Sequence, residues 1–409
     1  MIDPAAARFP WRNVTASAFL PTILYSIGEG AIIPIIPLVA SRLGADIAGA
    51  ALVVAMLVVG QLLGDLPAGS LVARIGERTA MIGASLLSAA GVGVAIVAPN
   101  PGVLGFGILL VGVATAVFAL ARHAFMTSFV PPAYRARALS TLGGTHRLGF
   151  LVGPFATAGV IQATGWAGDA FWIHLAACLA VIVVLVVLRD PAEVVAAAGR
   201  SAPVRGTRTA GDGLFRTIAA RRDVLATLGV GSALISALRA SRNVILPVWA
   251  VSIGLDGATT AIIIGTAAAV DFALFYAGGW IMDRFGRLWT AVPSMVGLGS
   301  AHLVLAFTHD VPGAEVWFAV VAGLLALANG IGSGILMTLG ADLSDPANPA
   351  PFLAAWRFTN DTGAAVAPLI IGGVTAVASL PVAAAVVGVL GLAGALNLSV
   401  YVPRFSSRR

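Results

Sequence analysis

The sequence predicts an all-α membrane protein with twelve spanning helices in two related halves, and three observations lead to this prediction. First, 59% of the 409 residues are hydrophobic and 10% are charged, with a mean hydropathy of +0.97, whereas soluble domains are about 45–50% apolar and about 25% charged. Second, the apolar residues form unbroken runs such as 181–188, unlike the alternating pattern of a transmembrane β-barrel. Third, the two halves of the chain repeat one another. A water-soluble domain, a disordered chain and a coiled coil are therefore excluded.

The twelve spans follow from apolar runs that end at glycine, proline or a charged residue. Each run approaches or exceeds the roughly 20 residues that a helical span needs. In the first half the spans cover residues 14–40, 47–72, 79–98, 103–129, 139–163 and 170–188. In the second half they cover residues 224–250, 259–282, 289–308, 314–340, 352–378 and 381–402.

One long polar stretch divides the two sets of spans. It has seven arginines, two prolines and several glycines, and too few apolar residues for a core, so it is interpreted as a cytoplasmic linker. The predicted organisation is an N-terminal six-helix bundle over residues 1–188, the linker over 189–223 and a C-terminal six-helix bundle over 224–409.

The positive charge is carried by arginine alone, because the sequence has no lysine. Of the 24 arginines, 18 lie in the termini, the linker and the turns at 74–78, 135–137 and 284–287. One, Arg42, lies in the opposite loops, and the other five lie inside spans. The positive-inside rule then places both termini in the cytoplasm. We expect a multi-pass protein of the cell (plasma or inner) membrane, and no nucleic-acid partner is needed to explain the basic composition.

Several functional classes are excluded by missing residues and motifs. The absence of lysine excludes a P-loop and a Schiff-base enzyme. Cys178 is the only cysteine, which excludes an internal disulfide and a cysteine-based metal site. Residues 1–12 show no cleavage site after an apolar core, so no removable signal peptide is expected. The sequence contains no H-E-x-x-H or G-x-S-x-G motif. We therefore expect no enzyme activity, no metal and no cofactor.

The two halves align with little slippage. A shift of 210 residues, and later of 214, superimposes Pro37 on Pro247, Gly44 on Gly254, Asp46 on Asp256, Gly69 on Gly279, Arg74 on Arg284, Gly76 on Gly286, Pro132 on Pro346, Gly149 on Gly363 and Pro154 on Pro368. Two six-span halves of parallel topology are the architecture of transporters that open alternately around a site at the membrane midplane.

Two turns at repeat positions, after spans 2 and 8, share glycines and arginines. Their sequences are Gly69-Ser-Leu-Val-Ala73-Arg74-Ile-Gly76-Glu77-Arg78 and Gly279-Trp-Ile-Met-Asp283-Arg284-Phe-Gly286-Arg287. They resemble the signature loop of the major facilitator superfamily, G-x-L-x-D-R-x-G-R-R. Glycine permits positive φ and close helix approach, and the carboxylate can pair with arginine or cap a helix. Ala73 replaces the family's aspartate in the first copy, so the gate there is either absent or supplied by Asp65.

A third motif lies in span 5. Its sequence, Gly149-Phe-Leu-Val-Gly153-Pro154-Phe-Ala-Thr-Ala-Gly159, resembles the G-x-x-x-G-P-x-x-G-G motif of the superfamily's antiporters, although the double glycine is not kept. The alternative is ordinary packing of small residues between helices. The expected gating residues are Gly69, Arg74, Gly76, Arg78, Gly149, Gly153, Pro154, Gly279, Asp283, Arg284, Gly286 and Arg287.

With the repeat included, the resemblance covers the whole chain. It implies the major facilitator fold, with 12 transmembrane helices in two pseudo-symmetric six-helix bundles around a central cavity. It also implies a secondary active transporter of the 12-span drug/proton antiporter branch, which exports amphipathic or hydrophobic small molecules in exchange for protons. The alternative is a proton-coupled symporter that takes up an organic metabolite, which would favour a cavity rich in hydrogen-bonding side chains. The expected partners are a small-molecule substrate, protons and the lipid bilayer, with a monomeric protein.

Ionisable residues inside spans are the candidate site residues, because a charge buried in a bilayer costs at least a few kcal/mol unless it is paired. For proton coupling and the substrate cavity, the candidates are Glu29, Asp65, Arg122, Arg147, Arg239, Asp271, Asn360 and Asp361. Glu29 and Arg239 occupy matching repeat positions near mid-membrane with opposite charge. Glycines on both sides of Glu29 favour a cavity there, whereas the alternative is a structural, hydrogen-bonded carboxylate.

A shared depth suggests charge pairing near the cytoplasmic side. Four of the candidates lie about eight or nine residues from the cytoplasmic span ends, or about 12 Å deep: Asp65, Arg122, Arg147 and Asp361. In the superfamily, span 2 lies close to span 11 and span 5 close to span 8. We therefore expect the two aspartates to pair with Arg122, Arg147 or Arg357 when that side is closed, and Asp271 to join through Arg147.

Overall fold

The computed structural model describes residues 18–130, 132–188, 214–344 and 350–406, and its regular structure in these residues is helical throughout. The first half contains α2 (Leu20–Ile32), α3 (Ile36–Arg42), α4 (Ile47–Ile75), α5 (Glu77–Ile96), α6 (Pro101–Phe129), α7 (Pro132–Thr164), the short helix η3 (Ala167–Ala170) and α8 (Phe171–Val187). The second half contains α10 (Leu214–Ala220), α11 (Arg222–Val224), η4 (Leu225–Gly229), α12 (Val230–Ser252), α13 (Gly257–Phe285), α14 (Leu288–Ala306), α15 (Ala314–Ile331), α16 (Ile335–Leu343), α17 (Ala350–Val377) and α18 (Leu380–Ser406).

Ten helical stretches in the described residues are long and apolar enough to cross a membrane. The helices α7 and α17, of 33 and 28 residues, are also long enough, but ionisable residues such as Arg147 and Asp361 lower their hydropathy. Each of the twelve predicted spans thus corresponds to a helix or to a broken helix, and the predicted all-α membrane fold is confirmed. Residues 14–17 of the first predicted span and 189–213 of the predicted linker lie outside the described residues.

Two predicted spans are broken helices, which hydropathy alone did not show. The first span is divided into α2 and α3 around Pro34 and Pro37, because proline removes a backbone donor and clashes with the preceding turn. The tenth is divided into α15 and α16 at Gly332–Gly334, where Gly334 has a φ of 81°. Such a break leaves backbone carbonyls available for side chains.

The predicted internal repeat is visible in the backbone. Asp46 Oδ1 accepts a hydrogen bond of 2.7 Å from Gly49 N at the start of α4, and Asp256 Oδ1 accepts one of 3.0 Å from Thr259 N at the start of α13. The glycines that end these helices, Gly76 and Gly286, have φ values of 84° and 93°, which glycine adopts without strain. Both halves therefore use the same caps at the same places.

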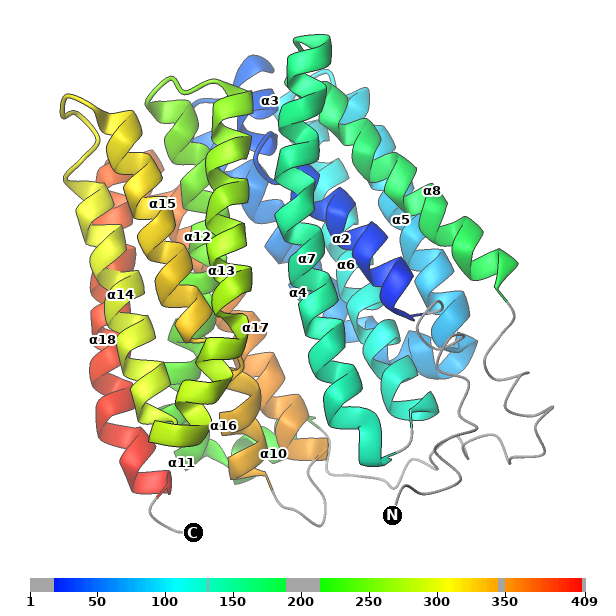
Figure 1. Ribbon diagram of the computed structural model, residues 1–409, viewed down its shortest axis with the longest axis vertical. Coiled ribbons are helices and arrows are strands. Elements are labelled where there is room, and N and C mark those ends of the chain that lie inside the picture. Colours follow the sequence, from blue (N-terminus) through cyan, green and yellow to red (C-terminus); the bar gives the residue numbers. More distant parts are fainter. Residues whose placement is uncertain (1–17, 131, 189–213, 345–349, 407–409) are drawn as a thin grey trace.

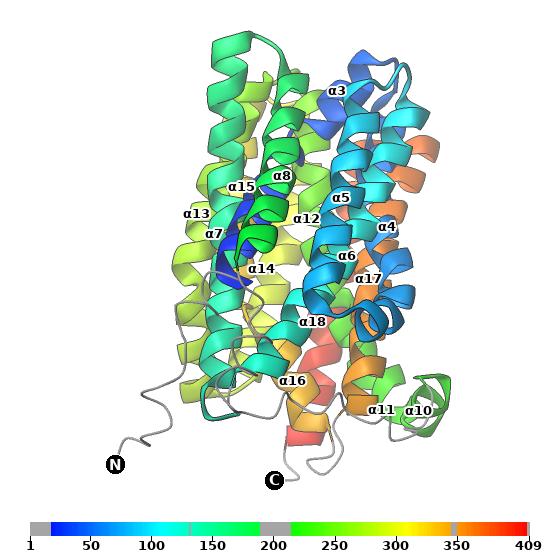
Figure 2. The ribbon, with the colours of Figure 1, turned by 90° about the vertical axis from the view of Figure 1, so that its right-hand side faces the viewer.

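The helices of the first half pack on one side of the molecule and those of the second half on the other (Figures 1 and 2). Across the boundary, α7 packs against α13, and α4 packs against α17. The lower end in Figure 1 carries the α4–α5 and α13–α14 turns, α10 and the last turn of α18. We call it the basic end, for its arginines Arg74, Arg78, Arg284, Arg287 and Arg404.

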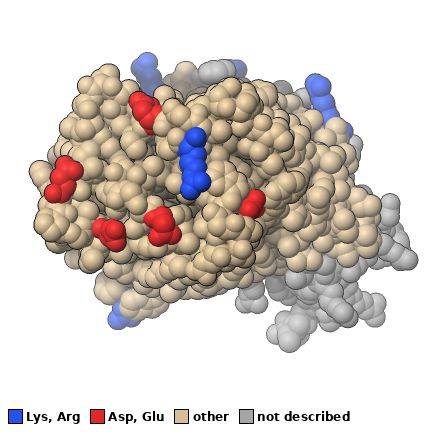
Figure 3. Space-filling view, turned by 90° about the horizontal axis from the view of Figure 1, so that it is seen from above, with Lys and Arg blue, Asp and Glu red and all other residues tan. Residues whose placement is uncertain are grey.

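The opposite end is acidic. Its loops and first helical turns carry Asp46, Asp169, Asp256, Asp310 and Glu315. Figure 3 views this face, on which acidic side chains lie around a central basic one and further basic side chains show at the edges. One end of the helix bundle is thus basic and the other acidic, which is the charge difference that the positive-inside rule describes between the two sides of a membrane.

The glycine motif of span 5 holds α7 against α2. A Cβ atom on Gly153 would lie 2.5 Å from Ala31 N and from Ile27 O of α2, and one on Gly149 would overlap Ser26. Gly363, the repeat counterpart of Gly149, lies equally close to the backbone of Ala233 in α12. Close backbone approach between small residues is how helices pack in lipid.

Gly153→Ala is therefore expected to destabilise the protein by about 1–3 kcal/mol, because backbone atoms of α2 would have to move. Gly159→Ala, on the same helix, is the matched control, since a Cβ atom added at Gly159 would meet nothing within 4 Å. The measurement is the thermal unfolding midpoint of each purified variant in detergent. Equal midpoints for the two variants would contradict this role for Gly153.

Candidate functional site

A cavity of about 480 Å³ lies between the two halves. Helices α2, α4, α6 and α7 line it from one side, and α12, α13, α15 and α17 from the other. Its ionisable lining consists of five arginines, four carboxylates and one histidine: Arg122, Arg147, Arg239, Arg242, Arg357, Glu29, Asp65, Asp271, Asp361 and His146.

Seven of the eight candidate cavity residues line this cavity: Glu29, Asp65, Arg122, Arg147, Arg239, Asp271 and Asp361. The eighth, Asn360, is absent from the lining and is only 8% exposed. Consecutive residues on a helix point about 100° apart, so Asp361 can face the cavity while Asn360 faces neighbouring helices. Among the described residues, no group of three or more His, Cys, Asp or Glu side chains could hold a metal.

Glu29 is the most enclosed carboxylate of the lining, with 3% of its surface exposed. Gln61 Nε2 of α4 donates it a long hydrogen bond of 3.3 Å. Arg122 of α6 interacts with it electrostatically across the cavity, but no ion pair to Glu29 is present among the described residues. The carboxylate is thus buried at the cavity wall and only weakly held.

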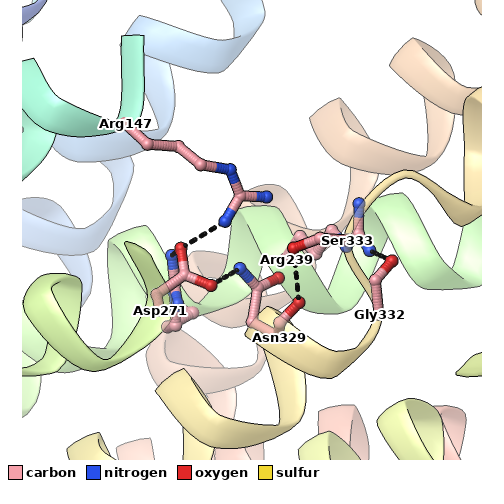
Figure 4. A network of polar contacts seen from close by, with 7 residues as sticks. Arg147, Arg239, Asp271, Asn329, Gly332 and Ser333 are labelled. Carbon is pink, nitrogen blue, oxygen red and sulfur yellow. Dashed lines mark hydrogen bonds and ion pairs between the residues drawn. The ribbon is translucent and has the colours of Figure 1, made fainter. Parts of the chain in front are cut away.

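Asp271 of α13 lies at the centre of a polar network (Figure 4). Its Oδ2 is 2.9 Å from Arg147 Nη1 of α7 and 3.9 Å from Arg242 Nη2 of α12. Asn329 Nδ2 of α15 donates a hydrogen bond of 2.7 Å to Oδ1. The expected pair of Asp271 with Arg147 is therefore present, and it joins the two halves.

Arg239 lies beside this network without a carboxylate partner among the described residues. Its Nη2 donates to the carbonyl of Gly332, at the break between α15 and α16 (Figure 4), and its buried Nε has no acceptor. It interacts electrostatically with Arg147, Asp271 and Arg242. The broken helix thus positions a guanidinium on the cavity wall.

A second link between the halves lies nearer the basic end. Arg357 of α17 is 3.2 Å from Asp65 Oδ1 of α4 and 3.3 Å from Asp361 Oδ2 on its own helix. The expected pairing of these two aspartates with Arg357 is therefore present. With 47% of the Arg357 side chain exposed, the pair is open to water, and exposed pairs contribute at most about 1 kcal/mol.

Toward the acidic end the lining becomes apolar and buried. The residues there are Ile33, Val54, Leu57, Val244 and Leu246. Beyond them Gly257 packs near Leu38, and Gly372 near Leu52, across the two halves. Apolar contact therefore closes the cavity on the acidic side, whereas charged and partly exposed groups line it on the basic side.

The signature turns differ from expectation in their contacts. Asp283 is exposed and makes no hydrogen bond or ion pair among the described residues, so it neither pairs nor caps a helix here. Instead, Arg287 Nε is 2.8 Å from Asp342 Oδ2 of α16. In the first copy, Arg78 Nε donates to the carbonyl of Leu185 at 2.8 Å and so caps the end of α8. Arg78 and Arg287 are thus anchored to neighbouring helices.

Several lining residues were not among the eight candidate cavity residues, although Arg357 was expected as a pairing partner: Gln61, His146, Ser236, Arg242, Asn243, Asn329 and Arg357. Gln61 lies four residues before Asp65, one helical turn away on the same face, and that spacing was the available signal. Arg242 lies three residues after Arg239, on the same face for the same reason.

Comparison with known proteins identifies relatives of this fold. Residues 18–270 match the family model described as the Major Facilitator Superfamily. Over 158 residues the chain is 28% identical to the uncharacterized MFS-type transporter YfkF of Bacillus subtilis (strain 168), and this match covers 39% of the chain and 40% of that protein.

Two solved structures are similar along nearly their whole length. A POT family transporter in complex with 5-aminolevulinic acid has a TM-score of 0.74 at 10% identity, with 96% of each chain covered. A POT peptide transporter in complex with sulfate has a TM-score of 0.74 at 14% identity, with 95% of this chain and 94% of that chain covered. At these identities the likeness shows the fold alone.

Proposed function

Because the chain belongs to the major facilitator superfamily and is a membrane transporter rather than an enzyme, we propose that it is a proton-coupled antiporter that exports amphipathic small molecules. The observation behind this proposal is the enclosed, weakly held Glu29 carboxylate on the wall of the cavity between the halves. Such a carboxylate can hold a proton or a polar group of the substrate, but not both at once. Competition of this kind couples the movement of the substrate in one direction to the movement of protons in the other.

The packing of the span 5 motif supports the antiport direction. The motif that resembles the antiporter sequence places Gly149 and Gly153 directly against residues 26–31 of α2, the segment that contains Glu29. A change in the state of Glu29 therefore acts on a close contact between two helices of the first half. The apolar lining toward the acidic end would accommodate the hydrophobic part of an amphipathic substrate.

A second candidate, proton-coupled uptake of an organic metabolite, is favoured by one observation. Besides its charged groups, the cavity lining includes hydrogen-bonding side chains that suit a polar solute: Gln61, Thr115, Ser236, Asn243 and Asn329.

The proposal includes an orientation and a domain organisation. The basic end faces the cytoplasm of the cell membrane, by the positive-inside rule, and the two termini lie on that side. Residues 1–188 and 224–409 form the two moving bundles, and 189–223 link them. During the exchange, the cavity is closed alternately at the acidic end, as it is here, and at the basic end.

The direction of proton movement relative to the substrate is tested in vesicles by the sign of the pH change in the lumen. Purified protein is reconstituted with a pH-sensitive dye in the lumen, at equal pH on both sides, and each compound of a substrate panel is added outside. Antiport makes the lumen more alkaline, because entering substrate is exchanged for protons. Acidification would overturn antiport in favour of the second candidate, and an unchanged lumen for every transported compound would overturn proton coupling.

A further inference from the structure

Positive charge accumulates at one place on the cavity wall. Arg147, Arg239 and Arg242 surround the single carboxylate of Asp271, so this group carries two charges in excess. The side chains of Arg147 and Arg242 are 20% and 18% exposed. We call these three arginines the cationic cluster.

The other ionisable groups of the lining supply only one of the two missing negative charges. Arg122 is balanced by Glu29, and Arg357 is shared by Asp65 and Asp361. Charges in a low-dielectric site cost several kcal/mol unless they are compensated. The excess at the cationic cluster therefore calls for an anion from outside the protein.

The cationic cluster, which lines the cavity, also has unused donor capacity. Arg239 uses Nη2 for the carbonyl of Gly332 and has no acceptor at its buried Nε, although Arg239 lines the cavity. Arg242 lies 3.9 Å from Asp271, beyond hydrogen-bond length. The planar fork of a guanidinium matches the oxygens of a carboxylate or a phosphate.

We propose that the cationic cluster binds an anionic group of the substrate, a carboxylate or a phosphate ester, so that the transported compounds are organic anions. This inference rests on the proposed transport function but not on the direction of proton movement. The bound anion competes with Asp271 for Arg147, which joins the halves. Substrate binding therefore loosens that contact and promotes the change of access.

Binding to the purified protein in detergent tests the proposal without any transport step. The probes are benzoate, phenyl phosphate, benzamide and benzylamine, which share one ring and differ in charge. Dissociation constants are measured by calorimetry for the wild type and for Arg239→Gln, Arg239→Lys, Asp271→Asn and Arg42→Gln. Arg42 lies at the acidic end, over Trp166 and away from the cavity lining, and serves as the control.

We expect the wild type to bind benzoate or phenyl phosphate at least tenfold more tightly than benzamide or benzylamine, and the tighter of the two anions identifies the group. Arg239→Gln should weaken anion binding about tenfold, and Arg239→Lys should restore part of it. Asp271→Asn should strengthen anion binding several-fold, because it removes the competing carboxylate while its amide keeps a similar shape. Arg42→Gln should match the wild type.

The substitutions at Arg239 and Asp271 are expected to change anion affinity in opposite directions. This difference distinguishes an anion-binding site from a purely structural role of these residues. Equal binding of benzoate, phenyl phosphate and benzamide would overturn the proposal, as would weaker anion binding in Asp271→Asn. If anions bind as expected but no proton moves in the vesicle assay, the proposed proton coupling fails and the anion site stands.

Discussion

Glu29→Gln is expected to abolish proton-coupled transport while the protein still folds and reaches the membrane. Glutamine has nearly the shape of glutamate and can keep a hydrogen bond with Gln61, now 3.3 Å away, but it cannot exchange a proton. Since Glu29 is almost fully enclosed at the cavity wall, water cannot substitute for the lost carboxylate. The measurement is substrate-driven proton flux in vesicles, and we expect at least a tenfold loss.

Glu315→Gln is the matched control, since Glu315 is exposed at the start of α15 on the acidic end. It should transport at the wild-type rate. Both variants should elute as the wild type does in size-exclusion chromatography, which excludes misfolding. If Glu29→Gln retained the wild-type flux and its pH dependence, Glu29 would be excluded from the mechanism.

Arg147→Ala is expected to shift the protein away from the state seen here, in which the acidic end of the cavity is closed. The substitution removes the 2.9 Å ion pair between α7 and α13 and leaves Asp271 with Asn329 and a distant Arg242. Breaking a buried pair by removing one partner costs about 3–5 kcal/mol, and about 5.5 kcal/mol would invert a 99:1 equilibrium. Asp271→Ala in the same chain should restore part of the balance, because it removes the stranded charge.

Cysteine labelling measures this shift. Leu62→Cys reports on the cavity and Leu38→Cys on the contact at the acidic end, while the single native cysteine, Cys178, is buried. The four proteins of the double-mutant cycle are compared at the same pH. Strictly additive changes in labelling would show that the two residues do not interact.

The spans and the repeat could be predicted because they depend on local properties of the chain. Apolar length determines a span, and the glycines at 76 and 286 mark turns that require positive φ. The helix breaks could not be placed, because hydropathy is nearly the same on both sides of Pro34 and of Gly332. The pair between Arg147 and Asp271 was predicted from helix neighbours in the superfamily rather than from the two residues themselves.

The direction in which each side chain points was harder to predict from the sequence than the spans were. In a bundle within lipid, the outer and inner faces of a helix are both apolar, so composition does not show which face lines the cavity. The neighbours Asn360 and Asp361 illustrate this, since only Asp361 reaches the cavity. The partner of Arg287 was missed for a related reason: Asp342 lies in α16, whose separation from α15 depends on a break that the sequence did not reveal.

The five arginines and four carboxylates of the cavity lining leave one net positive charge when all are ionised, and in the proposed alternation this charge would make the balance between the two states sensitive to membrane voltage. A cavity has the electrical potential of the compartment to which it is open. One elementary charge moved across 100 mV changes the free energy by about 2.3 kcal/mol. If the basic end faces the cytoplasm, as proposed above, a negative cell interior would draw the empty transporter toward its cytoplasm-open state.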